Sequence, residues 1–486
     1  MNLEPHGAGI SRRGLLASSL ALGVLGAGGR AAAETFPPLA TRDGASTVRG
    51  RTIPWRAETG ETILRNAAGQ ARATVFSVSY MAKGPRAARR PVTFLWNGGP
   101  GGASWHLREH LSPRITVAAP AAPGFRFVDN PSSLIDTSDL VFIDAPGTGY
   151  SRILDPSAKP EYWGVEEDGR AFATAIAQWL EAHGRRAAPV FLVAESYGGT
   201  RAGQVVRDLA EHAIAVTGVT FISPTLSPLG GSQNWYESYS PALTLAPFAS
   251  IARFHGRGAY GSASIDEVAA KALAFAEGEY ATALRAKASL GSEDRDHLAG
   301  KVSAFIGLPA STILANDLVV PVPRFLTDLL ADRGLIVDAG DGRDTQPAPP
   351  PGQSLSVLTP DKGYDTTASI ASLIKDDLGF PAIGPYQRDP VEISRMWNQS
   401  VTRTGKTVDI LQAVMRENAK LRVFMVGGYY DAIVPYAAPL HALAAALPAS
   451  RFDHQIYATG HGVYEDVPLR PKTTADLRAF YLRTMS

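Results

Sequence analysis

Short, almost entirely hydrophobic runs recur along the chain and alternate with longer stretches that have helical periodicity. The runs occupy residues 92–96, 140–143, 190–193, 219–222 and 421–426. Strands without polar alternation are covered on both faces, which is typical of parallel sheets between helical layers. Residues 166–181, between the second and third runs, have the helical pattern. We therefore predict an α/β fold with a mainly parallel central sheet flanked by helices.

The segments between and before these runs have different patterns. Two β-rich stretches, at residues 61–65 and 71–81, are separated by Asn66-Ala67-Ala68-Gly69 and predict an antiparallel hairpin. From about residue 225 to residue 395 the chain has Ala-rich helical segments, such as residues 265–288, and a Pro-rich loop. We interpret this block as a helical cap inserted into the core. The predicted domains are the core at residues 34–224 and 396–486 and the cap at residues 225–395.

The first 33 residues have the pattern of an export signal. Arg12-Arg13 precede a Gly- and Ala-rich apolar run that extends to Gly29, and Ala31-Ala32-Ala33 follow it. This pattern predicts a twin-arginine-type signal peptide at residues 1–33, cleaved near Ala33, and hence a periplasmic or secreted protein. A membrane anchor is the alternative, but the apolar run is short. No later segment is long and apolar enough to span a bilayer, so we expect no membrane partner after signal removal.

Charge and composition exclude several classes of function. The chain of 486 residues has 47 Lys and Arg against 46 Asp and Glu, so no overall field attracts nucleic acid or an anionic membrane. Cysteine is absent, which excludes disulfides, thiolate metal sites and a cysteine nucleophile. The chemistry must therefore come from other side chains.

One serine has the sequence context of a nucleophile. The run at residues 190–193 is followed by Ala194-Glu195-Ser196-Tyr197-Gly198-Gly199, and a helical pattern begins near residue 200. A strand-to-helix turn of this kind lifts a serine hydroxyl clear of its own backbone, as in hydrolases. We therefore predict that Ser196 is a catalytic nucleophile.

Two downstream residues complete a candidate triad. A serine hydroxyl needs an imidazole to take its proton and a carboxylate to orient that imidazole. Asp431 follows the run at residues 421–426, and His461 follows a predicted last strand at residues 454–457. Both should lie beside Ser196 in the order that this fold uses. Asp453 and His454 are rivals, but they lie within or before that strand.

A glycine-rich loop offers the donors of an oxyanion hole. Trp96-Asn97-Gly98-Gly99-Pro100-Gly101-Gly102 follows the run at residues 92–96. An oxyanion hole needs one amide from such a loop and one from the residue after the nucleophile, so we assign the Gly99 and Tyr197 amides. A phosphate cradle is the alternative, but no Lys-Ser or Lys-Thr follows.

A second catalytic pattern competes with the serine site. His106-Leu107-Arg108-Glu109-His110 matches an inverted zinc-protease motif, which on a helix places two imidazoles on one face. It has no third ligand at a distinctive spacing, and the serine constellation is complete. We therefore expect no metal and no cofactor.

The motifs together resemble the serine carboxypeptidase family, from about Phe76 to the C-terminus and weakly across the cap. The resemblance rests on five segments: Asn97 to Gly101, Asp144 to Ser151, Glu195 to Gly199, Gly428 to Asp431 and Gly460 to Gly462. It implies an α/β-hydrolase fold and removal of C-terminal amino acids from peptides with a free C-terminal carboxylate. It also implies that Asn97, Gly98 and Glu195 hold that carboxylate.

The chain departs from the family pattern at three places. Gly102 stands where many members have Cys, and Ala194 stands where Gly is usual. A second carboxylate-binding Glu of the family is missing, because the segment 105–113 places Leu111 or His110 near that position and leaves Glu109 out of register.

The chemistry of Glu195 gives a pH expectation that is independent of the family. A carboxyl group beside the nucleophile can face a substrate carboxylate only when one of the two is protonated, so acidic conditions should favour peptidase turnover. A supporting role for Glu195 in the turn is the alternative.

Two other functions remain as alternatives for the whole protein: an esterase or acyltransferase with the same triad, and a binding protein with a silent site. Trp235, Tyr236 and Tyr239 line a pocket or, more commonly for such residues, pack the cap on the core.

Overall fold

The computed structural model describes residues 40–85, 87–118, 124–228, 240–349, 365–381 and 384–486. The predicted signal peptide and the aromatic residues Trp235, Tyr236 and Tyr239 lie outside these residues. No helix among the described residues has the length and the hydropathy needed to cross a membrane.

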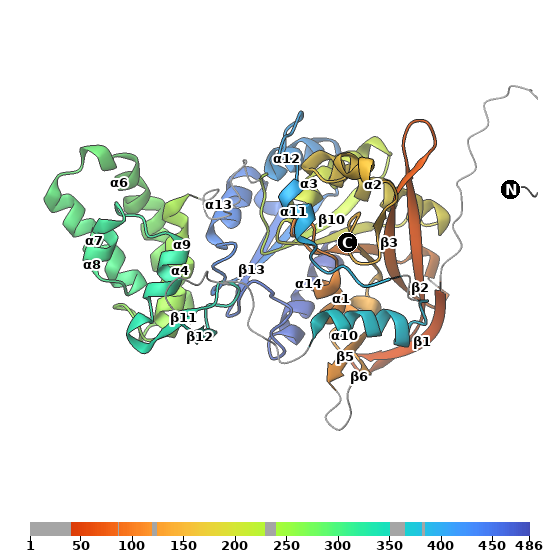
Figure 1. Cartoon of the computed structure of the whole chain (residues 1–486), viewed down its shortest axis with the longest axis horizontal. Coiled ribbons are helices and arrows are strands. Elements are labelled where there is room, and N and C mark those ends of the chain that lie inside the picture. The colour runs from red at the N-terminus through yellow and green to blue at the C-terminus, as the bar shows by residue number, and fades with distance from the viewer. Residues whose placement is uncertain (1–39, 86, 119–123, 229–239, 350–364, 382–383) are drawn as a thin grey trace, which may run out of the picture. The chain divides into compact units, whose positions relative to one another are not determined.

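A ten-stranded mixed sheet forms the centre of the protein (Figure 1). Its order is β1-β2-β3-β7-β4-β9-β10-β13-β14, with β8 paired to β3. The strands from β7 to β14 in this order are parallel, and β1, β2, β3 and β7 pair antiparallel in succession. The bounds are β1 (Ala40–Val48), β2 (Arg51–Arg65), β3 (Ala71–Ala82), β4 (Val92–Trp96), β7 (Asp139–Ile143), β8 (Arg152–Ile153), β9 (Val190–Glu195), β10 (Val216–Ile222), β13 (Arg422–Gly428) and β14 (Phe452–Tyr457).

Helices cover both faces of the sheet because the strands are hydrophobic on both faces. Phe94 belongs to a core cluster with helices α2, α3, α12 and α13, whereas its neighbour Leu95 belongs to a second cluster with α1, α10 and α14. This confirms the predicted α/β fold with a mainly parallel sheet. The bounds are α1 (Trp105–Leu111), α2 (Val165–Ala182), α3 (Gly198–Glu211), α10 (Thr366–Ser372), α12 (Thr407–Glu417), α13 (Ala437–Ala446) and α14 (Arg470–Met485).

The segment between β10 and β13 contains two packing groups. Helices α4 to α9 share a third hydrophobic cluster with Tyr430 and Ala432 after β13, and in it Phe248 and Phe325 stack with ring centroids 4.0 Å apart. By contrast, Ile370 of α10 packs in the second core cluster. The bounds are α4 (Leu245–Phe254), α5 (Ile265–Phe275), α6 (Ala281–Arg285), α7 (Ser292–Ile306), α8 (Ala310–Ala315), α9 (Val322–Asp328), β11 (Leu335–Val337), β12 (Thr345–Pro347) and α11 (Val391–Met396). The domain boundaries at residues 225 and 395 stay a prediction.

Two details differ from the sequence patterns. The helix expected over residues 265–288 is divided, because a π-helical turn at Ala276–Tyr280 separates α5 from α6. A further two-stranded ribbon, formed by β5 (Arg114–Ala118) and β6 (Phe125–Asp129), lies beside α1 in the chain.

The register of the sheet determines where the predicted site residues meet. Ile222 at the end of β10 lies opposite Glu195 of β9 and opposite Val426 of β13. The loops after these parallel strands therefore leave the sheet at one edge.

Candidate active site

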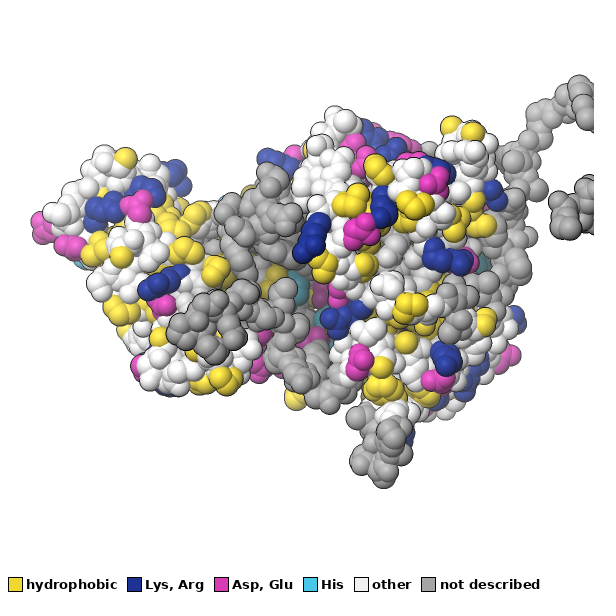
Figure 2. Space-filling view, viewed as in Figure 1, with side chains coloured by type: hydrophobic (Ala, Val, Ile, Leu, Met, Phe, Trp, Pro, Cys, Tyr) yellow, Lys and Arg dark blue, Asp and Glu magenta, His cyan; other side chains and the backbone are white. Residues whose placement is uncertain are grey.

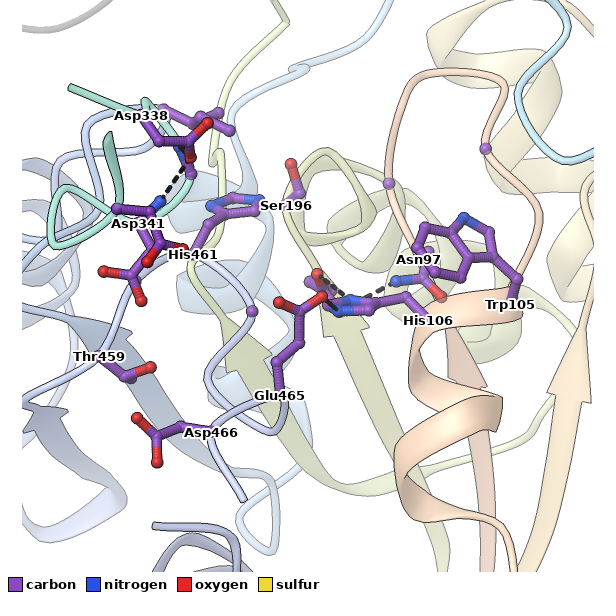
Figure 3. A pocket seen from close by; sticks show the side chains of 18 of the residues that line it. Asn97, Trp105, His106, Ser196, Asp338, Asp341, Thr459, His461, Glu465 and Asp466 are labelled. Atoms are coloured by element: carbon purple, nitrogen blue, oxygen red, sulfur yellow. Dashed lines mark hydrogen bonds and ion pairs between the residues drawn. The ribbon is translucent and has the colours of Figure 1, made fainter. Parts of the chain in front are cut away.

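A cavity of about 510 Å³ lies at this edge of the sheet (Figure 3). Ser196 and His461 line it, together with Asn97, Gly98, Gly99 and Glu195. The loop between β11 and β12 and the segment after His461 line the cavity as well. In the space-filling view, histidine and acidic side chains are visible in a hollow near the centre of the molecule (Figure 2).

Ser196 occupies a strained turn between β9 and α3. Its φ angle is 57°, and its amide donates to the carbonyl of Ile222 at 2.9 Å. A positive φ at a residue with a side chain is costly and marks functional sites. The turn also needs glycine, because a Cβ at Gly199 would lie 2.7 Å from the Cβ of Pro224. Ala194 lies within β9 and is not among the residues with positive φ, so its side chain fits there.

Asp431 and His461 form a hydrogen-bonded pair. Asp431 is completely buried, and its Oδ2 lies 2.8 Å from Nδ1 of His461. Its Oδ1 accepts hydrogen bonds from the backbone amides of Ile433 at 2.8 Å and Val434 at 2.9 Å. Burial disfavours a charged His461, but the carboxylate of Asp431 outweighs that effect and raises the pKa of His461.

Ser196 lies beside His461 in the cavity (Figure 3). Among the described residues, no hydrogen bond joins the Ser196 hydroxyl to His461, although catalytic hydrogen bonds are often long without substrate. The rival Asp453 forms an ion pair with Arg483 at 3.1 Å, and neither it nor His454 lines the cavity. The structure therefore brings together the three side chains expected for the triad, whose catalytic roles stay a prediction.

The glycine-rich loop after β4 lies directly against the turn at Ser196. A Cβ at Gly98 would lie 2.5 Å from the amide nitrogen of Tyr197, so only glycine permits this approach. Gly99 has a φ of 116°. Within the described parts of the chain, neither the Gly99 amide nor the Tyr197 amide donates to a protein acceptor. Both amides are therefore available for an oxyanion, which is the role predicted for them.

Glu195 is part of a buried polar group that extends away from Ser196. The side chain of Asn97 donates to Oε2 of Glu195 at 2.9 Å and accepts from the amide of Leu107 at 3.1 Å. Nδ1 of His106 lies 2.8 Å from Oε1 of Glu195. Nε2 of the same ring contacts Glu465. Each residue of this group, Asn97, His106, Glu195 and Glu465, lines the cavity.

The surroundings of His106 favour its positively charged form. Burial disfavours the imidazolium, but Glu195 and Glu465 outweigh burial and raise the pKa of His106 to about 10. The side chain that faces Glu195 is therefore a histidine whose charged form is favoured.

The sequence analysis missed His106 and Glu465. It placed Leu111 or His110 near the missing acid of the family, but Leu111 is buried in the second core cluster. Nδ1 of His110 accepts from Arg470 at 3.1 Å. The available signal was the motif from His106 to His110, which was interpreted only as a metal motif.

The hydrogen bonds around these histidines favour protons over a metal ion. His106, His110 and Glu465 offer ligand atoms within 4.8 Å of one another. Because Arg470 donates to Nδ1 of His110, the neutral ring carries its proton on Nε2, where a metal would need a lone pair. His106 has acidic partners on both ring nitrogens. The expectation of no metal stays a prediction.

A loop of the insertion is bonded to the backbone around both triad partners. The amide of His461 donates to the carbonyl of Gly340 at 2.6 Å, and the amide of Ala432 donates to the carbonyl of Ala339 at 3.0 Å. Arg343 of the same loop donates to the carbonyl of Ala458 at 3.0 Å. These contacts hold the loops of Asp431 and His461, and the sequence analysis did not find them.

The fold and the match to a family model together indicate the class of protein. The sheet, its helical layers and a serine at the strand-to-helix turn are those of the α/β-hydrolase fold, and the chain is a serine hydrolase. The family described as serine carboxypeptidase matches residues 67–238, which include the loop after β4 and Ser196. This match confirms the resemblance for the motifs that it covers, and the motifs that carry Asp431 and His461 lie beyond residue 238.

Two solved structures are among those similar to this chain, and the first of them supports the fold. Kex1(delta)p, a prohormone-processing carboxypeptidase from Saccharomyces cerevisiae, is 11% identical and has a TM-score of 0.57, covering 88% of this chain and 91% of its own. A thermophilic esterase from Thermogutta terrifontis is 14% identical with a TM-score of 0.38, covering 88% of this chain and 99% of its own. A search of curated protein sequences returned no match.

Proposed function

We propose that this serine hydrolase is a carboxypeptidase that releases C-terminal amino acids through an acyl-enzyme. Ser196 attacks the last peptide carbonyl, while His461 takes the hydroxyl proton and then gives it to the leaving amine. Asp431 orients His461, and the amides of Gly99 and Tyr197 stabilise the oxyanion. Water, activated by His461, then hydrolyses the ester and restores Ser196.

One observation carries the proposal: the Asn97–Glu195 hydrogen bond lies next to Ser196 and in the same cavity as His461. An esterase acting on uncharged substrates has no need of such a group. In the proposed reaction it holds the substrate carboxylate, and it thereby limits cleavage to the last peptide bond.

Acidic conditions favour binding of the peptide in this proposal. Glu195 and Glu465 both contact His106, so a substrate carboxylate would bring a further acidic group to this site. Binding is therefore linked to uptake of a proton, and KM should fall as the pH falls. The chemical step has the opposite requirement, because His461 acts as a base only when it is neutral. We also propose that the protein is exported after cleavage near Ala33.

The test compares a blocked dipeptide with its C-terminal amide. The carboxypeptidase should hydrolyse the free acid and lose most activity on the amide, and the Ser196→Ala variant should be inactive on both. A fluorophosphonate should label the wild-type protein and not this variant. Equal turnover of acid and amide, or hydrolysis of esters alone, would instead identify an esterase or acyltransferase. No labelling and no turnover would indicate a binding protein.

A further inference from the structure

One end of the cavity is rich in carboxylates. Asp338, Asp341 and Asp344 from the loop between β11 and β12, and Asp466 after the His461 loop, line it with one cation, Arg343. Nη2 of Arg343 donates to Asp341 at 2.6 Å and to Asp466 at 3.0 Å. The guanidinium is thus already engaged by two of the four carboxylates.

Asp338 is the distinctive member of this group. It is only 2% exposed, and its Oδ1 accepts from the amides of Gly340 at 2.7 Å and Asp341 at 2.9 Å. Its Oδ2 has no hydrogen-bond partner among the described residues. The Asp338 carboxylate is on the His461 side of Ser196, and Asn97, Trp105 and His106 are on the other side (Figure 3).

A buried carboxylate oxygen without a partner is unfavourable and becomes favourable when a cation approaches it. Burial raises the pKa of Asp338, and the neighbouring Asp344 and Asp341 raise it further, while the two amide hydrogen bonds oppose the shift. Among the described residues, Oδ2 of Asp338 therefore has no donor that would compensate its charge.

We infer that Asp338 Oδ2 and the adjacent carboxylates form a subsite for a cationic substrate group, an ammonium or guanidinium, carried by a residue that flanks the scissile bond. A peptide with Lys or Arg at that position supplies the missing donor. The choice of a peptide rests on the proposed function, whereas the charge preference applies to any substrate that enters this cavity.

The experiment uses the full-length protein with EDTA present, so that divalent metal ions do not compete for the carboxylates. Blocked dipeptides carry lysine or its neutral isostere norleucine at each of the two positions beside the scissile bond. At one of these two positions, the substrate with lysine should have a kcat/KM about tenfold higher than the substrate with norleucine, because one favourable charge pair contributes an effect of this size. The Asp338→Asn variant keeps the Oδ1 acceptor for the turn and should lose this preference.

The matched control is Asp389→Asn, which changes another carboxylate that lines the cavity but is already paired with Arg388 at 2.6 Å. This control should keep the lysine preference. No preference in the wild-type protein, or an equal preference in Asp338→Asn, would overturn the inference. If Asp338→Asn does not fold, n-pentylamine should still inhibit the wild-type protein more strongly than n-pentanol, and equal inhibition would be the contrary result.

A further pair of substrates separates the inference from the proposed function. Blocked lysine and norleucine p-nitrophenyl esters need no peptidase activity. Peptide hydrolysis without a lysine preference refutes the subsite alone. Ester hydrolysis with a lysine preference, and no peptide hydrolysis, refutes the carboxypeptidase and supports the subsite.

Discussion

His106 binds Glu195 through one ring nitrogen, with Nδ1 2.8 Å from Oε1, while its other ring nitrogen contacts Glu465. The sequence analysis found the second acid of the serine carboxypeptidase family missing and placed Leu111 or His110 near its position, whereas the side chain that contacts Glu195 is His106. The ring of His106 lies between the two carboxylates and holds Glu195 in position through these contacts.

The charge on His106 predicts how stability depends on pH. Its pKa in the folded protein, about 10, lies above the ordinary value of 6.5. Its stabilising contribution is therefore complete below about pH 6.5 and is lost as the pH rises through about 10. The free energy of unfolding, measured by urea denaturation, should decrease over this range more in the wild type than in His106→Gln. A constant difference between the two proteins would contradict a charged His106.

Glu195 should matter more for peptides than for uncharged esters. The Glu195→Ala variant loses a group proposed to hold the substrate carboxylate, so kcat/KM for a blocked dipeptide should fall about tenfold further than for a neutral ester. The rise of KM with pH should also weaken in the variant. An equal loss on both substrates would show that Glu195 only supports the turn at Ser196.

The strands could be predicted from the sequence because their burial is encoded locally. The run at residues 92–96 coincides with β4, since a strand covered on both faces needs apolar side chains throughout. The run at residues 421–426 ends before β13 does, because the strand continues through two glycines to Gly428. A Cβ at Gly428 would lie 2.1 Å from the carbonyl oxygen of Gly460, which explains the glycine but is visible only in three dimensions.

The order of motifs along the chain also placed Ser196, Asp431 and His461 at one edge of the sheet, because parallel strands end at the same side. No local pattern indicates that His106 contacts Glu465, which lies 359 residues away. The contacts of the loop between β11 and β12 could not be predicted from a local pattern either. Its residues are typical of turns, and the hydrogen bond from His461 to Gly340 joins segments that only the tertiary structure brings together.

Arg343 should act as a positioning residue for the triad. Its guanidinium joins Asp341, Asp466 and the carbonyl of Ala458, and so links the insertion to the segment that carries His461. The Arg343→Met variant should lose about tenfold or more in kcat with little change in KM for a neutral ester, because small displacements of a catalytic base are costly. The pH profile of kcat should shift as well.

The control for Arg343 is Arg324→Met, which removes an exposed ion pair with Asp328 inside α9. It should leave kcat and its pH profile close to the wild type, because exposed pairs contribute little. A loss of folded protein in Arg343→Met without any change in the kcat of the folded fraction would point to stability alone.

Gly98 should be indispensable for the oxyanion site. In Gly98→Ala the new Cβ would lie 2.5 Å from the Tyr197 nitrogen and 2.9 Å from the Cβ of Ser196, so the loop or the turn must move. Displacing one oxyanion donor costs about a hundredfold in kcat, and we expect at least that loss in an ester assay. Gly300→Ala is the matched control, since no atom lies within 4 Å of its added Cβ in α7, and alanine there should if anything raise the melting temperature. Full activity in a folded Gly98→Ala protein would mean that the loop after β4 does not supply the oxyanion donor.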